Sequence, residues 1–314
     1  MTENRYLPEG MLIGSVENTE YISSPQGLER AMAQGRIIES TAVLCDGDLN
    51  LTVDLGNVKG IIRRDEVIYQ PSNDVPKDIA IISRVGKPIC FKVLAIEYDD
   101  NGGATAILSR RSAQMECLHK YLLCLDPGDI IPARITHLEH FGAFVDVGCG
   151  IASLLSIDCI SVSRISHPKD RFYIGMPIKA VVKSIDRETG RIYVTHKELL
   201  GTWEENASRF RVGQTVVGIV RSVEQYGIFI ELAPNLAGLA EYKEGISVGQ
   251  SVAVYIKNII PERMKIKLVI IDSCKGEQNT MKMEYYVSSD KEHLDYWRYS
   301  PVGTAKIIES RFSS

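Results

Sequence analysis

The sequence predicts a mainly β protein of three tandem five-stranded barrels joined by short helical linkers, with an N-terminal helix and a small C-terminal tail module. Two observations predict this fold. A segment starting at Gly128 aligns without a gap on one starting at Gly213, so the chain repeats itself at an offset of 85 residues. Within each repeat, short runs alternate apolar and polar residues between Gly, Asp and Asn turns, as strands do. Repeats of this size indicate small domains in series.

The chain begins with a leader and a divergent repeat. Residues 1–35 form the leader, where PQGLERAMAQG predicts one helix over residues 25–35, begun by Ser24 and Pro25. The first repeat occupies residues 36–112. Its five strand runs are IIESTAVL, LNLTVDL, GIIRRDEV, ICFKVLAIEY and ATAILSRR.

The second repeat shows the strand pattern most clearly. Residues 113–126 before it place apolar positions at helical spacing, which predicts a helical linker. The repeat itself, residues 127–199, contains IIPARITHL, GAFVDVG, IASLLSI, PIKAVVKSI and RIYVTHK. A second linker, residues 200–211, has helical character around Trp203.

The third repeat and the tail complete the chain. The third repeat, residues 212–272, is 11 residues shorter than the second in one loop and turns at Pro261 before its last strand. In the tail, residues 273–314, KMEYYVSS and DYWRYSP suggest two more strands packed on the third repeat.

The strand count favours one kind of barrel. Five short antiparallel strands in about 70 residues, with a longer insertion between the third and fourth, fit the closed barrel of the oligonucleotide-binding fold. A closed barrel also removes the exposed strand edges that promote aggregation.

Composition excludes several classes of protein. The chain has 314 residues, of which 45% are hydrophobic, and a net charge of −4, which is a globular composition. No apolar run approaches the roughly 20 residues that span a bilayer, and the start lacks the layout of a signal peptide. We therefore expect a cytoplasmic protein without a membrane partner. The seven cysteines have no CxxC spacing, which indicates reduced thiols.

The sequence contains no motif of catalysis or of cofactor binding. Gly148-Cys149-Gly150 is not followed by a phosphate-binding loop pattern. The six histidines have no ligand spacing. We expect no enzyme activity, no cofactor and no metal.

Two motifs carry a resemblance to a known family. FGAFVDVG over residues 141–148 and DRETGRIYVTHK over residues 186–197 are similar to the RNA-binding repeat of bacterial small-subunit ribosomal protein S1. The second repeat matches in nearly every diagnostic position, the third in its first half, and the first only remotely. The arrangement resembles the short, three-repeat S1-like proteins of Gram-positive bacteria.

The second repeat supplies a candidate surface for stacked bases. Alternation along GAFVDVG points Ala143 and Val145 into the barrel and Phe144 and Asp146 outward. With Phe141 at the neighbouring turn, Phe144 forms a platform on which unpaired bases stack. Stacking tolerates any base, so the sequence does not indicate which bases are preferred.

The resemblance implies polar partners around this platform. On the hairpin and the strand after it, these are Asp186, Arg187, Arg191 and Lys197. The histidine that the family places on the third strand is replaced by Ser156. Candidates to take its place lie in the long loop, namely Arg164, His167, Lys169 and Arg171.

The other two repeats differ from the second. The third keeps Tyr226 and Phe229 as a platform, with candidate phosphate contacts at Arg221, Lys257, Arg263, Lys265 and Lys267. The first has Leu49 and Thr52 where the rings belong, so it cannot stack bases there. Its cations suggest phosphate contact or docking on another surface: Arg63, Arg64, Arg84, Lys87, Lys92, Arg110 and Arg111.

The resemblance implies a non-catalytic protein that binds single-stranded RNA, in particular mRNA, at the small ribosomal subunit during translation. A monomer is the favoured state. Two alternatives remain open: a regulatory RNA-binding protein that acts independently of ribosomes, and a protein-interaction scaffold whose barrels no longer bind RNA. The negative net charge favours the scaffold slightly, whereas the outward rings favour RNA.

Overall fold

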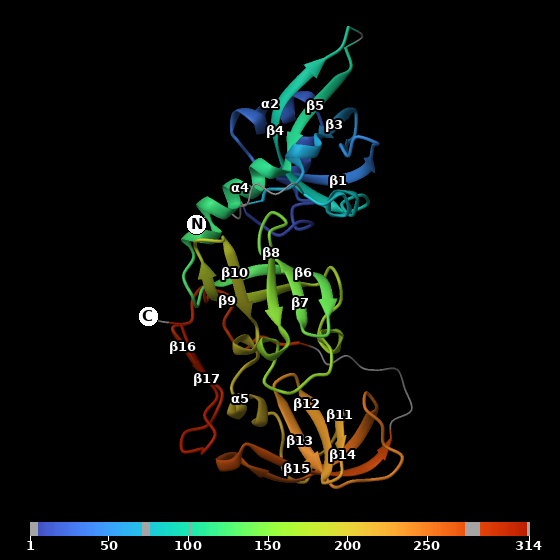
Figure 1. The fold of residues 1–314 in the computed structure, drawn as a ribbon. Helices are drawn as coiled ribbons and strands as arrows, with labels where there is room; N and C mark the ends of the chain where they lie inside the picture. Colours follow the sequence, from blue (N-terminus) through green and yellow to red (C-terminus); the bar gives the residue numbers. More distant parts are fainter. Residues whose placement is uncertain (1–5, 71–75, 101, 274–282, 313–314) are drawn as a thin grey trace.

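Three closed barrels of five strands follow one another along the chain (Figure 1). The structure is a computed structural model that describes residues 6–70, 76–100, 102–273 and 283–312. The predicted fold class is confirmed. None of the helices in these ranges has the length and apolar character needed to cross a bilayer.

Barrel one is preceded by two helices, of which one was predicted. The predicted helix is α2 (Pro25–Ala33), where the Ser24 side chain accepts a hydrogen bond from the Gly27 backbone N–H. Helix α1 (Val16–Ile22), which has only seven residues, was not predicted. The barrel consists of β1 (Ile38–Cys45), β2 (Leu51–Leu55), β3 (Val58–Ile62), β4 (Pro88–Tyr98) and β5 (Ala104–Ser109). Short helices η1 (Arg64–Glu66) and α3 (Asp78–Ile82) connect β3 to β4.

Barrel two follows a helical linker. The linker contains α4 (Arg110–Lys120) and η2 (Leu122–Cys124), and α4 starts earlier than predicted because Ser109 caps it. The barrel consists of β6 (Ile130–Glu139), β7 (Gly142–Asp146), β8 (Ala152–Ser156), β9 (Pro177–Asp186) and β10 (Arg191–Thr195). Its long loop carries η3 (Ile157–Cys159) and η4 (Pro168–Asp170). Ala143 and Val145 are fully buried in the core, as alternation along the strand predicts.

Barrel three follows η5 (Lys197–Leu200) and α5 (Trp203–Ala207). It consists of β11 (Thr215–Glu224), β12 (Gly227–Ala233), β13 (Leu236–Ala240), β14 (Ser251–Ile260) and β15 (Lys265–Ser273). The predicted turn at Pro261 is confirmed and forms η6 (Pro261–Arg263).

The tail packs on barrels two and three rather than on the third alone. It forms a two-stranded sheet of β16 (Tyr296–Arg298) and β17 (Glu309–Arg311). The strand predicted at KMEYYVSS is wrong over residues 283–289, and residue 282 lies outside the described ranges. Trp297 joins the core of barrel three, whereas Leu294 and Phe312 pack on barrel two.

The leader joins barrel one to barrel two through Glu9. Its buried carboxylate accepts hydrogen bonds from Arg110 Nε at 2.6 Å and from the Cys90 backbone N–H at 3.1 Å. The Glu9 backbone N–H donates to Asp146 Oδ2 at 2.7 Å, and its carbonyl accepts from Arg134 at 2.7 Å. Neighbouring guanidinium groups hold the pKa of Glu9 below its ordinary value despite burial. One leader residue therefore contacts β4, α4 and barrel two at once.

Asp146 is buried, so its predicted outward orientation is wrong. The side chain is 2% exposed and accepts hydrogen bonds from the backbone N–H groups of Glu9, Gly148 and Gly150. Burial and the nearby Glu9 carboxylate raise the pKa of Asp146 to about 7. The prediction failed because the leader packs over this end of β7, where the Glu9 backbone N–H donates to Asp146.

Two arginines that were candidates for RNA contact instead form the junction between barrels two and three. Arg171 and Arg221 both pair with Glu231, and the Arg171 and Glu231 side chains are 2% and 0% exposed. Arg221 also lies 3.2 Å from Asp170. A charge in such a place needs a paired partner. The sequence-based expectation that Arg171 and Arg221 contact RNA is therefore wrong, because the two side chains are only 2% and 10% exposed in this junction.

The tail contacts barrel two at a buried histidine. His196 is 0% exposed, lies 3.3 Å from the Tyr285 hydroxyl, and its Nδ1 is 3.2 Å from the Ile160 carbonyl. Burial lowers the pKa of His196 to about 4. The folded protein therefore keeps this imidazole neutral well below the pH at which an unfolded chain protonates it.

This histidine predicts acid sensitivity. Between pH 6.5 and pH 4 the unfolded chain binds a proton at His196 that the folded chain does not, so the contribution of His196 to stability falls with the pH, by up to about 3 kcal/mol, whereas Asp146 contributes in the opposite direction. Urea unfolding followed by circular dichroism at several pH values measures this loss. We expect a smaller loss in His196→Gln, whose side chain does not titrate. Equal losses in the two proteins would contradict the assignment.

Candidate nucleic-acid interface

A row of outward side chains crosses barrel two. Strand register places His137 opposite Phe144, Phe144 opposite Leu154, and Leu154 opposite Tyr193, on β6, β7, β8 and β10 in turn. Paired residues share one face of a sheet. Phe141, which is 55% exposed at the turn between β6 and β7, contacts Phe144 edge-on at a centroid distance of 6.1 Å. We call these five side chains platform two.

His137 belongs to platform two but was not among the predicted site residues. Its ring centroid lies 6.4 Å from that of Phe144, and its Nε2 lies 2.7 Å from Glu139 Oε1. The imidazole therefore comes from the first strand of the barrel, whereas the family places a histidine on the third strand, where Ser156 stands here. The signal in the sequence was its spacing, because a hairpin turning at residues 140–141 pairs position 137 with position 144.

Barrel three repeats the ring pair with nearly the same geometry. Tyr226 is 71% exposed and meets Phe229 edge-on, with centroids 6.1 Å apart and an interplanar angle of 84°. Strand register places Phe229 opposite Leu239 and Leu239 opposite Lys267, so these side chains form a row across the sheet. We call Tyr226, Phe229, Leu239 and Lys267 platform three. Two barrels thus present the same pair of exposed rings.

Barrel one has an aliphatic row at the same place. Register aligns Leu44 with Thr52, Thr52 with Ile61, and Ile61 with Ile107. Leu44 is 56% exposed. The row carries no aromatic ring, so barrel one lacks a stacking surface at this position.

The long loop of barrel two lies beside platform two at His167. This ring packs edge-on against His140, with centroids 4.6 Å apart, and its Nδ1 accepts from the Lys169 backbone N–H. Desolvation and the neighbouring His140 and Lys169 lower the pKa of His167, so the ring is mainly neutral at pH 7. Arg164 and Lys169 are exposed on the same loop.

The hairpin residues have different environments. Asp186 caps the turn itself, because its carboxylate accepts from the backbone N–H groups of Glu188 and Thr189 and from the Thr189 hydroxyl. These hydrogen bonds lower the pKa of Asp186. Arg187 points toward the linker, 3.7 Å from Asp126. Lys197 donates to the carbonyl of Asp158 at 3.3 Å.

The cations of barrel three are exposed at one end of the sheet. They are Lys257, Arg263, Lys265 and Lys267. Lys265 and Lys267 alternate along β15, so they share a face, and Lys267 ends platform three. These residues offer positive charge next to the ring pair.

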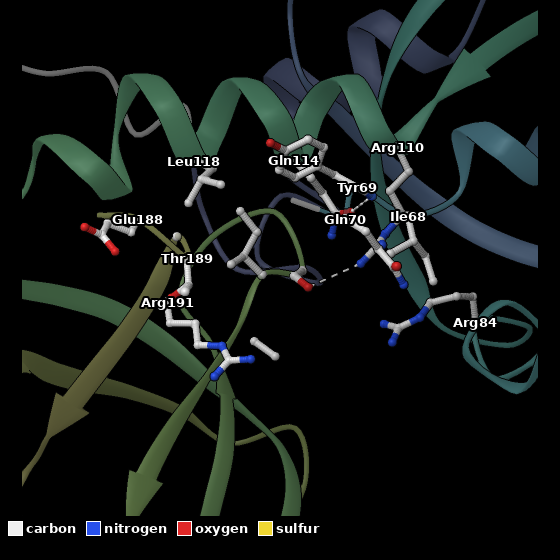
Figure 2. Close-up of a pocket in the computed structure, with 14 residues that line it drawn as sticks. Ile68, Tyr69, Gln70, Arg84, Arg110, Gln114, Leu118, Glu188, Thr189 and Arg191 are labelled. Carbon is white, nitrogen blue, oxygen red and sulfur yellow. Dashed lines mark hydrogen bonds between the residues drawn. The ribbon is translucent and has the colours of Figure 1, made fainter. Parts of the chain in front are cut away.

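Arg191 lines a cleft between barrels one and two (Figure 2). The cleft has a volume of about 620 Å³ and is walled by α4 and the β3–β4 connection on one side and by the β9–β10 hairpin on the other. Arg84 from barrel one and Arg191 from barrel two both extend into this space in Figure 2. Within the described ranges, no group of three or more His, Cys, Asp or Glu residues is placed to bind a metal ion.

The chain is similar in sequence to known proteins. The S1 RNA binding domain family matches residues 125–197, which include all of barrel two. The small ribosomal subunit protein bS1 of Staphylococcus aureus is 29% identical over 307 residues, covering 90% of this chain and 74% of that protein. The bS1 protein of Rhizobium meliloti is 27% identical, covering 69% of this chain and 39% of its own length.

A solved structure is also similar to the chain. It is a multidomain protein with nucleic acid binding domains from Streptococcus pneumoniae, which is 14% identical at a TM-score of 0.25. The match covers 76% of this chain and 73% of the other.

Proposed function

We propose that this chain, an S1-like protein of several repeats, binds single-stranded RNA through platforms two and three and performs no catalysis. The observation that supports the proposal most is the ring pair, present with centroids 6.1 Å apart in both barrels. Exposed rings beside cations are what sequence-tolerant binding of single strands requires, since bases stack and phosphates are attracted.

The proposed site comprises both ring pairs and the exposed polar residues around them. In barrel two these are Phe141, Phe144, His137, Arg164, His167, Lys169, Asp186, Arg187, Arg191 and Lys197. In barrel three they are Tyr226, Phe229, Lys257, Arg263, Lys265 and Lys267. Arg171 and Arg221 are left out because they pair with Glu231 and Asp170 inside the junction.

The relatives suggest where this binding takes place. Because they are named as proteins of the small ribosomal subunit, we propose that the chain binds mRNA at that subunit in the cytoplasm. Two platforms on one chain raise the affinity for a strand that reaches both, through effective concentration.

Barrel one is better suited to contact a protein than to stack bases. Its aliphatic row, in which Leu44 is exposed and Ile61 and Ile107 are half-buried, suits an apolar protein surface better than a base. Protein docking is thus a second candidate role, limited to this row. Sedimentation of the chain with purified ribosomal subunits, with and without Leu44→Asp, tests it.

A salt series tests the proposed function directly. Each phosphate contact with a single strand contributes a slope of about −0.7 to the plot of log affinity against log salt, so three to five contacts give roughly −2 to −3.5. Fluorescence anisotropy of a labelled, unstructured RNA measures this slope. Binding that is undetectable at low salt would refute the proposal. A slope near zero would show that the protein makes no phosphate contacts.

A further inference from the structure

The cleft between barrels one and two carries positive charge that the structure only partly neutralises (Figure 2). Three arginines line it, Arg84, Arg110 and Arg191, against the single carboxylate of Glu188. Arg110 is neutralised, since it is 1% exposed and binds both carboxylate oxygens of Glu9. The two guanidinium groups that remain lie on opposite walls of the cleft.

Arg84 is arranged to accept an anion. Its Nη1 lies 3.7 Å from Glu9 Oε2, a long contact to a carboxylate that already binds Arg110. Its side chain is 29% exposed. Desolvation and the nearby charge of Arg110 lower the pKa of Arg84, so an added negative charge here would be favourable.

The cleft is continuous with platform two. Residues two apart on a strand lie on the same face of the sheet. Leu154 therefore shares a face with Ala152 on β8, and Tyr193 shares a face with Arg191 on β10. Leu154 and Tyr193 belong to platform two, whereas Ala152 and Arg191 line the cleft. The cleft therefore begins about 7 Å along the strands from the stacking row.

We propose that the cleft is an RNA-binding site formed jointly by barrels one and two, in which Arg84 and Arg191 contact backbone phosphates of a strand whose bases stack on platform two. The inference rests on the proposed function of platform two. It gives barrel one a direct part in RNA binding even though its own row has no ring. Arginine suits this task because its planar group binds phosphate oxygens in pairs.

RNA length provides the test. Anisotropy is measured with an RNA of about 4 nucleotides, which covers one platform, and with one of about 12, which also reaches the cleft. We expect Arg84→Gln to weaken binding of the longer RNA roughly fivefold to tenfold, to reduce the magnitude of its salt slope by about 0.7, and to leave the shorter RNA unchanged. Arg30→Gln is the matched control, because Arg30 is an exposed arginine of α2 that lies over the Tyr21 ring and is absent from the cleft lining.

A second variant is needed because Arg84 also contacts Glu9, so that Arg84→Gln could disturb the fold. Arg191→Gln removes the cation of the opposite wall, is exposed, and should weaken the longer RNA more than the shorter. The joint site is overturned if Arg84→Gln binds the longer RNA as the wild type does, or weakens both lengths equally, while its circular dichroism is unchanged. Wild-type protein that binds neither length would overturn the proposed function and the joint site together, whereas the first two results leave the proposed function standing.

Discussion

Replacing Phe144 and Phe229 together by alanine is expected to lower the affinity for single-stranded RNA by about a hundredfold or more. Each base stacked on an aromatic ring contributes about 1–3 kcal/mol, and this variant removes one ring from each platform. The partner rings lose their edge-on neighbours as well, since both pairs have centroids 6.1 Å apart. Each single variant should retain one complete platform and lose roughly tenfold.

The measurement is anisotropy at one fixed salt concentration, because affinities at different salt cannot be compared. A matched control removes two exposed rings outside the platforms, Tyr98 on β4 and Tyr296 in the tail, which are 56% and 46% exposed. Phe144 and Phe229 are only partly buried, so circular dichroism should be unchanged. Equal RNA affinity of wild type and double variant would show that the ring pairs do not hold the bases.

Replacing Glu231 by glutamine is expected to destabilise the junction between barrels two and three by about 3 kcal/mol or more. Removing one partner of a buried ion pair leaves an uncompensated charge, which is far more costly than losing an exposed pair. Here the Arg171 side chain is 2% exposed and that of Arg221 is 10% exposed, and both pair with Glu231. Their charges would remain inside the junction, where Asp170 lies 3.2 Å from Arg221.

Tryptophan fluorescence during urea unfolding reports this effect. The chain has two tryptophans, Trp203 and Trp297, and both lie in the core cluster of barrel three. Asp78→Asn is the control, because it breaks an exposed pair with Arg64, for which we expect less than about 1 kcal/mol. Unfolding midpoints that are the same for Glu231→Gln and the control would show that the junction does not depend on this carboxylate.

The strands of barrel two were predictable because their pattern is local. Alternation from Ile130 onward gives a strand that the structure ends at Glu139, one residue beyond the predicted run. The ring pair Phe141 and Phe144 was likewise predictable, since a turn followed by a strand fixes both positions. Such features depend on neighbours within a few residues, and the sequence displays those neighbours directly.

The errors concern contacts between distant segments. Glu9 and Arg110 are 101 residues apart in sequence, and Arg171 and Glu231 are 60 apart. Local alternation places Asp146 outward, but the leader buries it. The loop sequence does not show whether an arginine is exposed or is paired with a carboxylate of another barrel. It therefore could not distinguish the buried Arg171 from the exposed Arg164.

The tail has a consequence for synthesis. Trp297 and Tyr299 complete the core of barrel three, although all five of its strands precede residue 274. During translation, all five strands of barrel three are therefore synthesised before Trp297 and Tyr299, two aromatic residues of its core. Domains generally fold in order of their emergence. Barrel three therefore completes its core only after residue 299 leaves the exit tunnel, and it is exposed to misfolding and to proteases until then.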